Sequence, residues 1–380
     1  MADNSWLGNL KGSATEAKQR AAEDAAQRKA AGQQKDSIIL NQKDISTGSW
    51  DAAKVLFTTI GGQLRPITAD DLASFRRNIA TIQSEKGKYA KGVTAKQVVD
   101  WSAGIVQGTQ FSVYGLQKSD LDRAKREITM AVPTYAQNSA DGRSAKVRFI
   151  TNAGPDSDVS RHHVLVEFMN YGPEAASGLT DPRKSAMRLR HGPLKIECDC
   201  GRWRFWFRYL ATIGGYNAGR PETGYPKIRN PKLQGIACKH IVRVMSEVQS
   251  GSATLAFLTK LMDKAKSSDE AKAALRHKQS EAEKIIKNQA RRTTGNDIKT
   301  SEQKRQEQSA KNAIKAAMTS AKPKKVKPKS KAAEKLSRAV MDLKEIGTSR
   351  ALAEKMYDRG VVNIPRGTSR EAFLAAFDGN

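Results

Sequence analysis

The three cysteines of this 380-residue chain fall in one short pattern. Cys198 and Cys200 are separated by a single residue, and Cys238 follows after 37 further residues, with His240 two positions beyond it. Three thiolates and one imidazole form a complete tetrahedral ligand set for Zn²⁺, and a closed set of four protein ligands is typical of structural rather than catalytic zinc. The sequence therefore predicts a structural zinc site made by Cys198, Cys200, Cys238 and His240.

A disulfide accounts for the cysteines less well than a metal does. An odd number leaves one thiol unpaired, and residues two positions apart rarely close a relaxed disulfide. The N-terminal sequence MADNSWLGNL lacks the basic start and apolar core of a secretory signal, so we expect a reducing compartment, where such clusters favour metal. The remaining alternative is three separately buried cysteines and a surface histidine, which would have to fall in this pattern by chance.

The residues around these four predict their local structure. LKIE at 194–197 is typical of a short strand that leads into the first cysteine. Trp203, Phe205, Phe207 and Tyr209 recur with a period of two, which predicts a second strand over RWRFWFRY, 202–209. IVRVMSEV at 241–248 has apolar residues at helical spacing, so the second ligand pair is expected at the start of a helix. The prediction is a β-hairpin that faces a helix.

A Cys-x-Cys pair, a spacer and a Cys-x-His pair at the head of an apolar helix resemble the SWIM-type zinc finger. The resemblance covers residues 192–248 and implies a ββα fold with the same four ligands. The spacer is long for that family and contains GGYNAGRPETGYPKIRNP, 214–231, as an apparent loop insertion. SWIM modules accompany helicases, kinases, transposases and recombination factors, which implies DNA or protein as partners.

The charge balance points to polyanionic partners. The chain has a formal net charge of +27 and a hydrophobic content of 38%, which favours DNA, RNA or an anionic membrane surface. No apolar run approaches the roughly 18 residues needed to span a bilayer, although amphipathic association with a membrane remains open. No nucleophile elbow, phosphate-binding loop or carboxylate pair is present, so we expect a protein that is not an enzyme.

Two basic clusters are candidate nucleic-acid contacts. The first surrounds the Cys-x-Cys pair and contains Arg188, Arg190, Arg202, Arg204 and Arg208, with Arg183, Lys184 and Lys195 nearby. On the predicted second strand its last three arginines share a face with Trp206, which suits phosphate contact and base stacking. The second cluster is KPKKVKPKSK, whose lysines are Lys322, Lys324, Lys325, Lys327, Lys329 and Lys331. A nuclear-import signal has the same composition. We expect largely non-specific, salt-dependent binding.

The whole chain is predicted to be an α+β protein with flanking arms. Residues 1–37 read as an Ala-rich helical or disordered arm, 38–191 as a mixed central domain and 192–250 as the SWIM-like finger. Residues 251–331 read as a helical and then basic linker, and 332–380 as a small three-helix module. In the central domain, helices are expected after Ser49, Thr68 and Thr94 and from about Ser119, and strands at 145–151 and 161–171.

Three further histidines leave two readings open. His162 and His163 open a predicted strand, and His191 lies just before the finger. They could form a second metal or catalytic site, and an enzyme of unrecognised type would use them. The other reading is a pair of strand-edge histidines, one facing inward and one outward, with no chemical role.

The cellular setting is an expectation from resemblance alone. A lone SWIM-type finger between Ala/Lys/Gln-rich arms is similar to virion proteins of tailed bacteriophages, including internal or ejected ones. That resemblance implies Zn²⁺ as cofactor, DNA and other virion proteins or further copies of the chain as partners, and a place in the virion. The alternative is a cytoplasmic or nucleoid regulator or recombination accessory protein that recognises DNA through the finger.

Overall fold

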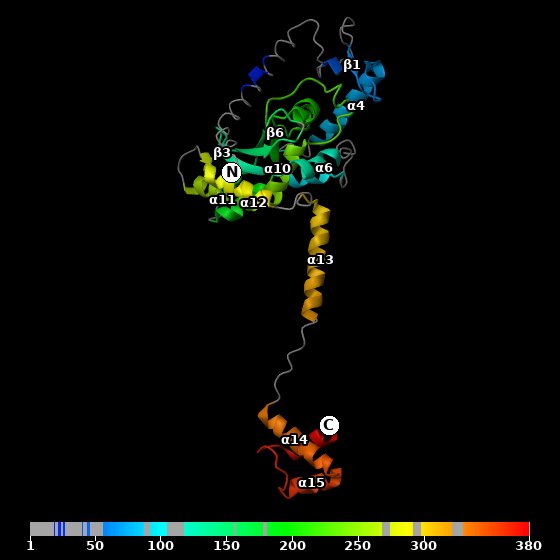
Figure 1. Ribbon diagram of the computed structural model, residues 1–380, viewed down its shortest axis with the longest axis vertical. Helices are drawn as coiled ribbons and strands as arrows, with labels where there is room; N and C mark the ends of the chain where they lie inside the picture. Colours follow the sequence, from blue (N-terminus) through cyan, green and yellow to red (C-terminus); the bar gives the residue numbers. More distant parts are fainter. Residues whose placement is uncertain are drawn as a thin grey trace. The chain divides into compact units, whose positions relative to one another are not determined.

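The computed structural model describes most of the chain in two compact units, Met1–Glu307 and Gln308–Asn380. The residues that it describes are 56–86, 92–104, 118–155, 157–177, 181–267, 274–291, 298–320 and 330–379, together with 19, 22, 23, 26, 40, 44 and 45. The expected arm over 1–37 therefore lies almost entirely outside the described residues. Among the described helices, none is both long and apolar enough to cross a membrane. Figure 1 shows the elements along the chain.

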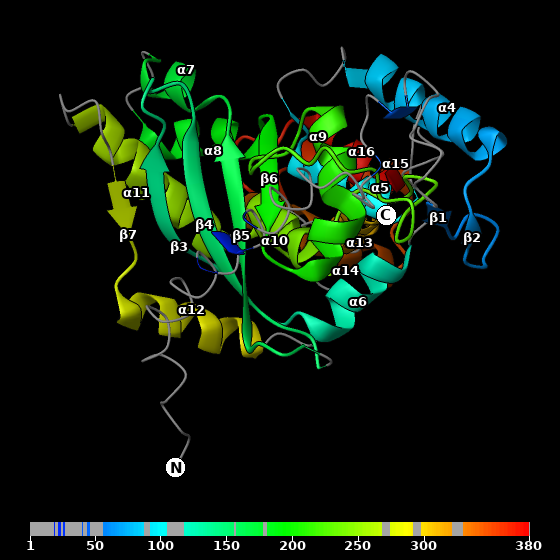
Figure 2. The ribbon, with the colours of Figure 1, turned by 90° about the horizontal axis from the view of Figure 1, so that it is seen from above.

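The first unit is built on a five-stranded antiparallel sheet. The strand order is β6-β5-β4-β3-β7, and Figure 2 shows the strands side by side. The strands are β3 (Ala131–Asn138), β4 (Ala145–Asn152), β5 (Arg161–Phe168), β6 (Leu194–Cys198) and β7 (Ala274–Arg276). The strands expected at 145–151 and 194–197 are thus confirmed, and the one expected at 161–171 is confirmed up to Phe168, where β5 ends. β7 occupies a stretch where only helix was expected. A separate ribbon pairs β1 (Phe57–Thr58) with β2 (Arg65–Pro66).

Helices cover the apolar face of the sheet. This face carries Val147, Phe149, Val164 and Val166, all fully buried. The central helix, α10 (Lys239–Ser250), contacts strands β3 to β6 and is buried from Lys239 to Val248. Around it pack α5 (Ala95–Ser102), α6 (Lys118–Glu127), α8 (Pro182–His191) and α11 (Ser252–Ser267).

The opposite face of the sheet has a small apolar cluster of its own. Val132 and Ile150 alternate with the residues of the main core and pack with Ala282 of α12 (Gln279–Ala290). The Gln289 side chain donates to the Ala131 carbonyl at 3.0 Å and accepts from the Ala131 N–H at 3.0 Å. α12 is therefore held to β3 by apolar contact and by a paired hydrogen bond.

The expected helix starts are confirmed at two N-caps. Thr94 caps α5, with its hydroxyl accepting from the Gln97 N–H at 3.2 Å and its own N–H donating to the Gln97 side chain at 2.8 Å. Thr68 exchanges equivalent hydrogen bonds with Asp71 at the start of α4 (Ala69–Lys86). The helix expected after Ser49 is wrong over its described part, because residues 57–58 are the strand β1. Ser49 itself lies outside the described residues.

The predicted C-terminal three-helix module is confirmed. Its helices are α14 (Lys331–Glu345), α15 (Arg350–Asp358) and α16 (Arg370–Gly379). Their core consists of Val340, Leu343, Ala353, Phe373 and Phe377. Gly347 follows α14 with φ of +73°, the left-handed conformation that commonly ends helices. The stretch expected to be linker contains a helix, α13 (Ser301–Ser320), whose side chains from 305 to 316 are all exposed.

Candidate metal centre

The structure brings the four predicted ligands together. The donor atoms of Cys198, Cys200, Cys238 and His240 all lie within 4.8 Å of one another, and all four residues are buried. Cys198 is the last residue of β6, Cys200 follows the strand, Cys238 is the N-cap of α10 and His240 is in the first turn of that helix. In the described part of the chain this is the one such group of histidine, cysteine and acidic side chains.

The donor set fits a tetrahedral zinc ion. With Zn–S bonds of about 2.3 Å, ligand atoms at the corners of a tetrahedron lie about 3.8 Å apart. The Cys198 sulfur lies 3.9 Å from Nδ1 of His240, so that nitrogen faces the sulfurs. The Nε2 atom of His240 is buried and has no hydrogen-bond partner among the described residues. Sulfur and imidazole donors in this spacing fit Zn²⁺ better than the hard cations, which prefer oxygen.

The second predicted strand is wrong, and with it the ββα description. After Cys200 the chain turns into the π-helix η2 (Trp203–Phe207), which continues as α9 (Arg208–Gly214). Trp203 and Phe207, four residues apart, are fully buried on one side of this helix. Phe205 is 49% exposed, whereas a strand would have placed it beside them. The centre is therefore made by one strand and the starts of two helices.

Both helix starts point backbone N–H groups at the cluster. The N–H of Trp203 donates to the Cys200 sulfur at 3.3 Å, and the N–H of Ile241 donates to the Cys238 sulfur. The partial positive charge at a helix N-terminus favours a thiolate. The local backbone therefore favours the charged form of the Cys200 and Cys238 sulfurs, which is the form that binds metal.

The surroundings shift the pKa values of the four ligand side chains in different directions. Burial alone would raise the pKa of Cys200, but hydrogen bonds from Cys198, Cys238 and His240 lower it well below its usual value. Burial raises the pKa of both Cys198 and Cys238, and it lowers the pKa of His240. Burial therefore favours the neutral imidazole, which is the form that binds metal. A bound cation would displace the remaining thiol protons.

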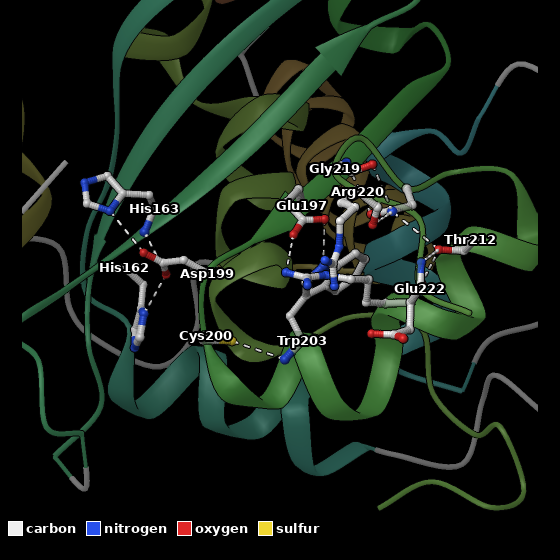
Figure 3. A network of polar contacts seen from close by, with 12 residues as sticks. His162, His163, Glu197, Asp199, Cys200, Trp203, Thr212, Gly219, Arg220 and Glu222 are labelled. Atoms are coloured by element: carbon white, nitrogen blue, oxygen red, sulfur yellow. Dashed lines mark hydrogen bonds and ion pairs between the residues drawn. The ribbon is translucent and has the colours of Figure 1, made fainter. Parts of the chain in front are cut away.

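Asp199, between the two cysteines of the first pair, ties the centre to the sheet (Figure 3). Its Oδ1 lies 2.7 Å from Nδ1 of His162, and its Oδ2 lies 3.1 Å from Nδ1 of His163. Its Oδ1 also accepts from the His163 N–H at 3.2 Å. Burial would raise the pKa of Asp199, but the two histidine hydrogen bonds lower it to about 2. Sequence reasoning missed this role, although an acid between two candidate ligands is a usable signal for an outer contact.

The three further histidines do not form a site together. His162 and His163 both turn to Asp199, and the His162 ring packs 4.3 Å from the ring of His240. His191 is an exposed residue at the C-terminal end of α8. The reading of one strand histidine facing inward and one outward does not hold, because both side chains are only 10% exposed and both contact Asp199.

The arginines near the cysteines lie in very different surroundings. Arg208 is buried and pairs with Glu197. The other carboxylate oxygen of Glu197 accepts from the indole N–H of Trp203 at 3.1 Å, and Figure 3 labels both of these residues. Burial raises the pKa of Glu197, and the charge of Arg208 opposes that rise. Arg190 is also buried, and its Nε donates to the Val248 carbonyl at 2.6 Å. These two guanidinium groups are engaged inside the protein and are not presented on its surface.

The other candidate arginines, Arg188, Arg202 and Arg204, are at least partly accessible. Arg202 pairs with Asp120 at 2.9 Å and lies 3.5 Å over the ring of Trp206. Arg204 is partly buried and Arg188 is exposed. The expected strand face of arginines with Trp206 does not exist, because the segment is helical. Of the lysine cluster, Lys331 is exposed at the start of α14, and Lys322, Lys324, Lys325, Lys327 and Lys329 lie outside the described residues.

Comparison with known proteins adds no relative. No protein-family model, no curated protein and no solved structure matches the chain with significance. The functional interpretation of this centre therefore depends on the residues themselves: a buried cluster of three cysteines and one histidine that fits a metal ion.

Proposed function

We propose that the protein is a non-enzymatic structural protein that holds one Zn²⁺ ion in the cluster of Cys198, Cys200, Cys238 and His240, in the manner of a SWIM-type finger. The observation that carries the proposal is the convergence of four buried donors from the end of β6, the turn that follows it and the start of α10. When bound, zinc supplies a cross-link between the edge of the sheet and the central helix. A closed set of four protein ligands leaves no open position for substrate, which favours a structural role.

Metal analysis of the purified protein tests the zinc site. We expect close to one equivalent of zinc per chain, retained in the His191→Gln variant and lost in Cys198→Ser/Cys238→Ser. The variants His240→Gln and His191→Gln form a matched pair. The first removes a ligand and should lose zinc, whereas the second alters an exposed residue and should keep it. Full zinc retention by the double serine variant would exclude the assignment.

The partner that we propose is nucleic acid, bound mainly without sequence preference. The support is the net charge of +27 and its concentration in two basic clusters. Each duplex phosphate that the protein neutralises makes the slope of log K against log salt more negative by roughly 0.9. Titration of duplex DNA at several salt concentrations should therefore give a steep slope, and an affinity that is insensitive to salt would contradict the proposal.

The setting that we propose is a tailed-phage virion, as an internal, ejected or head–tail component. Positive charge suits a protein stored beside densely packed DNA, and helical segments such as α13 suit assembly or passage through a narrow portal. Stoichiometric presence in purified particles is the test. The competing proposal, a DNA-binding regulator or recombination accessory protein, requires instead a strong preference for one duplex sequence and no place in the particle.

A further inference from the structure

The outward side of α8 carries a continuous basic stripe. Counting from Arg183, residues one, four, five and eight positions further along lie on the same side of a helix. In α8 these residues are all exposed: Arg183, Lys184, Met187, Arg188 and His191. The opposite side of α8 is buried through Ala186 and Leu189. α8 contains no acidic residue. The charge of these exposed residues is therefore directed away from the protein.

Within the part of the chain that the structure describes, the cations of this stripe have no partner. No ion pair or side-chain hydrogen bond among the described residues involves the guanidinium of Arg183 or Arg188 or the ammonium of Lys184. The nearest acid in the sequence, Asp181, is used as the N-cap and accepts from the Arg183 backbone N–H at 2.9 Å. Three positive charges are thus left for a ligand or for solvent.

Helix stability accounts for Arg188, which lies in the last turn of α8, but not for the positions of Arg183 and Lys184. The partial charge at a helix N-terminus is positive, so cations in the first turn are unfavourable there. Arg183 and Lys184 occupy that turn and no acidic residue of the turn offsets them. Asp181 offsets part of this cost as the N-cap, but neither cation has a side-chain partner among the described residues, and cations placed against a local preference in this way are expected at a functional surface.

We propose that this stripe of α8 binds the phosphate backbone of a nucleic acid. The proposal rests on the function proposed above and assigns its contact surface. From Arg183 to Arg188 the helix rises about 7.5 Å, a length over which a duplex carries about four phosphate charges. Met187 is the one apolar side chain on the stripe, so little apolar area is available to enter a bilayer, and an anionic membrane fits less well.

The stripe is held rigidly to the helix that carries His240. The buried Arg190 of α8 donates to the Val248 carbonyl at 2.6 Å and lies 3.5 Å from the carbonyls of Glu247 and Gly251. These carbonyls belong to the C-terminal end of α10, which needs donors from outside the helix. α8 is therefore fixed by a buried cation on one side and presents exposed cations on the other.

The test compares two triple variants that remove equal charge. Arg183→Gln/Lys184→Gln/Arg188→Gln removes the stripe. Lys284→Gln/Lys287→Gln/Arg291→Gln removes three exposed cations from α12 and the residue that follows it, on the opposite face of the sheet. Binding of a short fluorescent duplex DNA is measured between about 50 and 200 mM salt. We expect the negative slope of log K against log salt to become shallower by about 3 in the stripe variant and to stay unchanged in the α12 variant. Zinc content and melting temperature verify that both variants are folded.

Three results would overturn the proposal, and each is distinct. Equal loss in both variants would show that net charge alone governs binding, and the proposed nucleic-acid function would stand. Absence of duplex binding by the unaltered protein at low salt would overturn that function together with the stripe. Loss of binding to vesicles of phosphatidylserine and phosphatidylcholine, with duplex affinity unchanged in the stripe variant, would identify a membrane surface instead.

Discussion

Asp199 and His162 are joined by a 2.7 Å hydrogen bond between a carboxylate oxygen and Nδ1 of the imidazole. Asp199 stands between two sulfur ligands, and the His162 ring also packs against the ring of His240, the fourth ligand. This one contact therefore connects the turn after β6, the strand β5 and the first turn of α10. Outer contacts of this kind orient metal ligands and tune metal affinity.

Asp199→Asn should weaken zinc binding without removing a ligand. The amide keeps the shape of the side chain but loses the charge that accepts from His162 and His163. We expect zinc affinity to fall by about 10- to 100-fold, measured by competition with a chelator. Asp158→Asn, at an exposed position of the preceding loop, is the control and should bind zinc normally. Equal affinities in the two variants would show that Asp199 does not position the ligands.

Zinc removal should unfold the first unit and spare the second. Structural zinc can contribute on the order of 10 kcal/mol, which is comparable to the whole stability of a domain. The cluster joins β6 to the buried α10, so its loss opens the core. The helices α14 to α16 have their own core and no metal ligand. Hydrogen exchange after chelation, or in Cys238→Ser, should show lost protection in α10 and retained protection over 330–379. Retained protection in α10 would contradict the structural role.

Arg190 should matter for stability far more than its neighbour Arg188. Arg190→Gln leaves carbonyls at the end of α10 without their donor in a buried site, which costs about 2 kcal/mol of unfolding free energy. Arg188 is exposed, so Arg188→Gln should change stability by less than about 0.5 kcal/mol. Denaturant unfolding of the two variants measures the difference. Equal stabilities would mean that the Arg190 contacts contribute nothing.

The lysine cluster at 322–331 should affect affinity and not stability. KPKKVKPKSK has Val326 as its only large apolar residue, so replacement of its six lysines by glutamine removes little packing. We expect the melting temperature to remain within a degree or two of the original, while affinity for polyanions falls and depends less on salt. An early-melting six-glutamine variant would contradict this division between the folded core and the basic segment.

Acidification should release zinc from the first unit. Burial lowers the pKa of His240 below that of a free histidine, so the unfolded chain binds more protons than the folded one as pH falls below about 6.5. The histidine contribution to stability is therefore complete above that pH and declines below it, whereas the metal-bound thiolates add a loss that begins below the free cysteine pKa of about 8.5. Zinc affinity should fall by about tenfold per pH unit for each proton taken up. Residues 330–379 contain neither histidine nor cysteine, so their unfolding should change little over pH 8 to 5 and provides the internal control.

The metal centre is the part of this protein that its sequence determined most completely. Ligand identity is chemical: three sulfurs and an imidazole are recognisable wherever they occur, and the pairs Cys198/Cys200 and Cys238/His240 each span only three residues, at the end of β6 and at the start of α10. Periodicity was also sufficient for β4, β5 and α5, because alternation of apolar residues or an N-cap such as Thr94 acts over a few residues. The same is true of the three C-terminal helices.

Only the tertiary structure decided the conformation of residues 202–209 and which of their charged side chains are buried in ion pairs. Aromatic residues at every second position suit a strand, but Trp203 and Phe207 are also one helical turn apart, and the local pattern does not choose between the two. The choice follows from contacts outside the segment: the sulfur cluster that accepts the Trp203 N–H, and the edge of β6 where Glu197 receives Arg208. In the same way, only the tertiary structure distinguishes Arg190 from Arg188, two residues of equal charge. Arg190 is buried because it faces the carbonyl end of α10, and Arg188 does not face it.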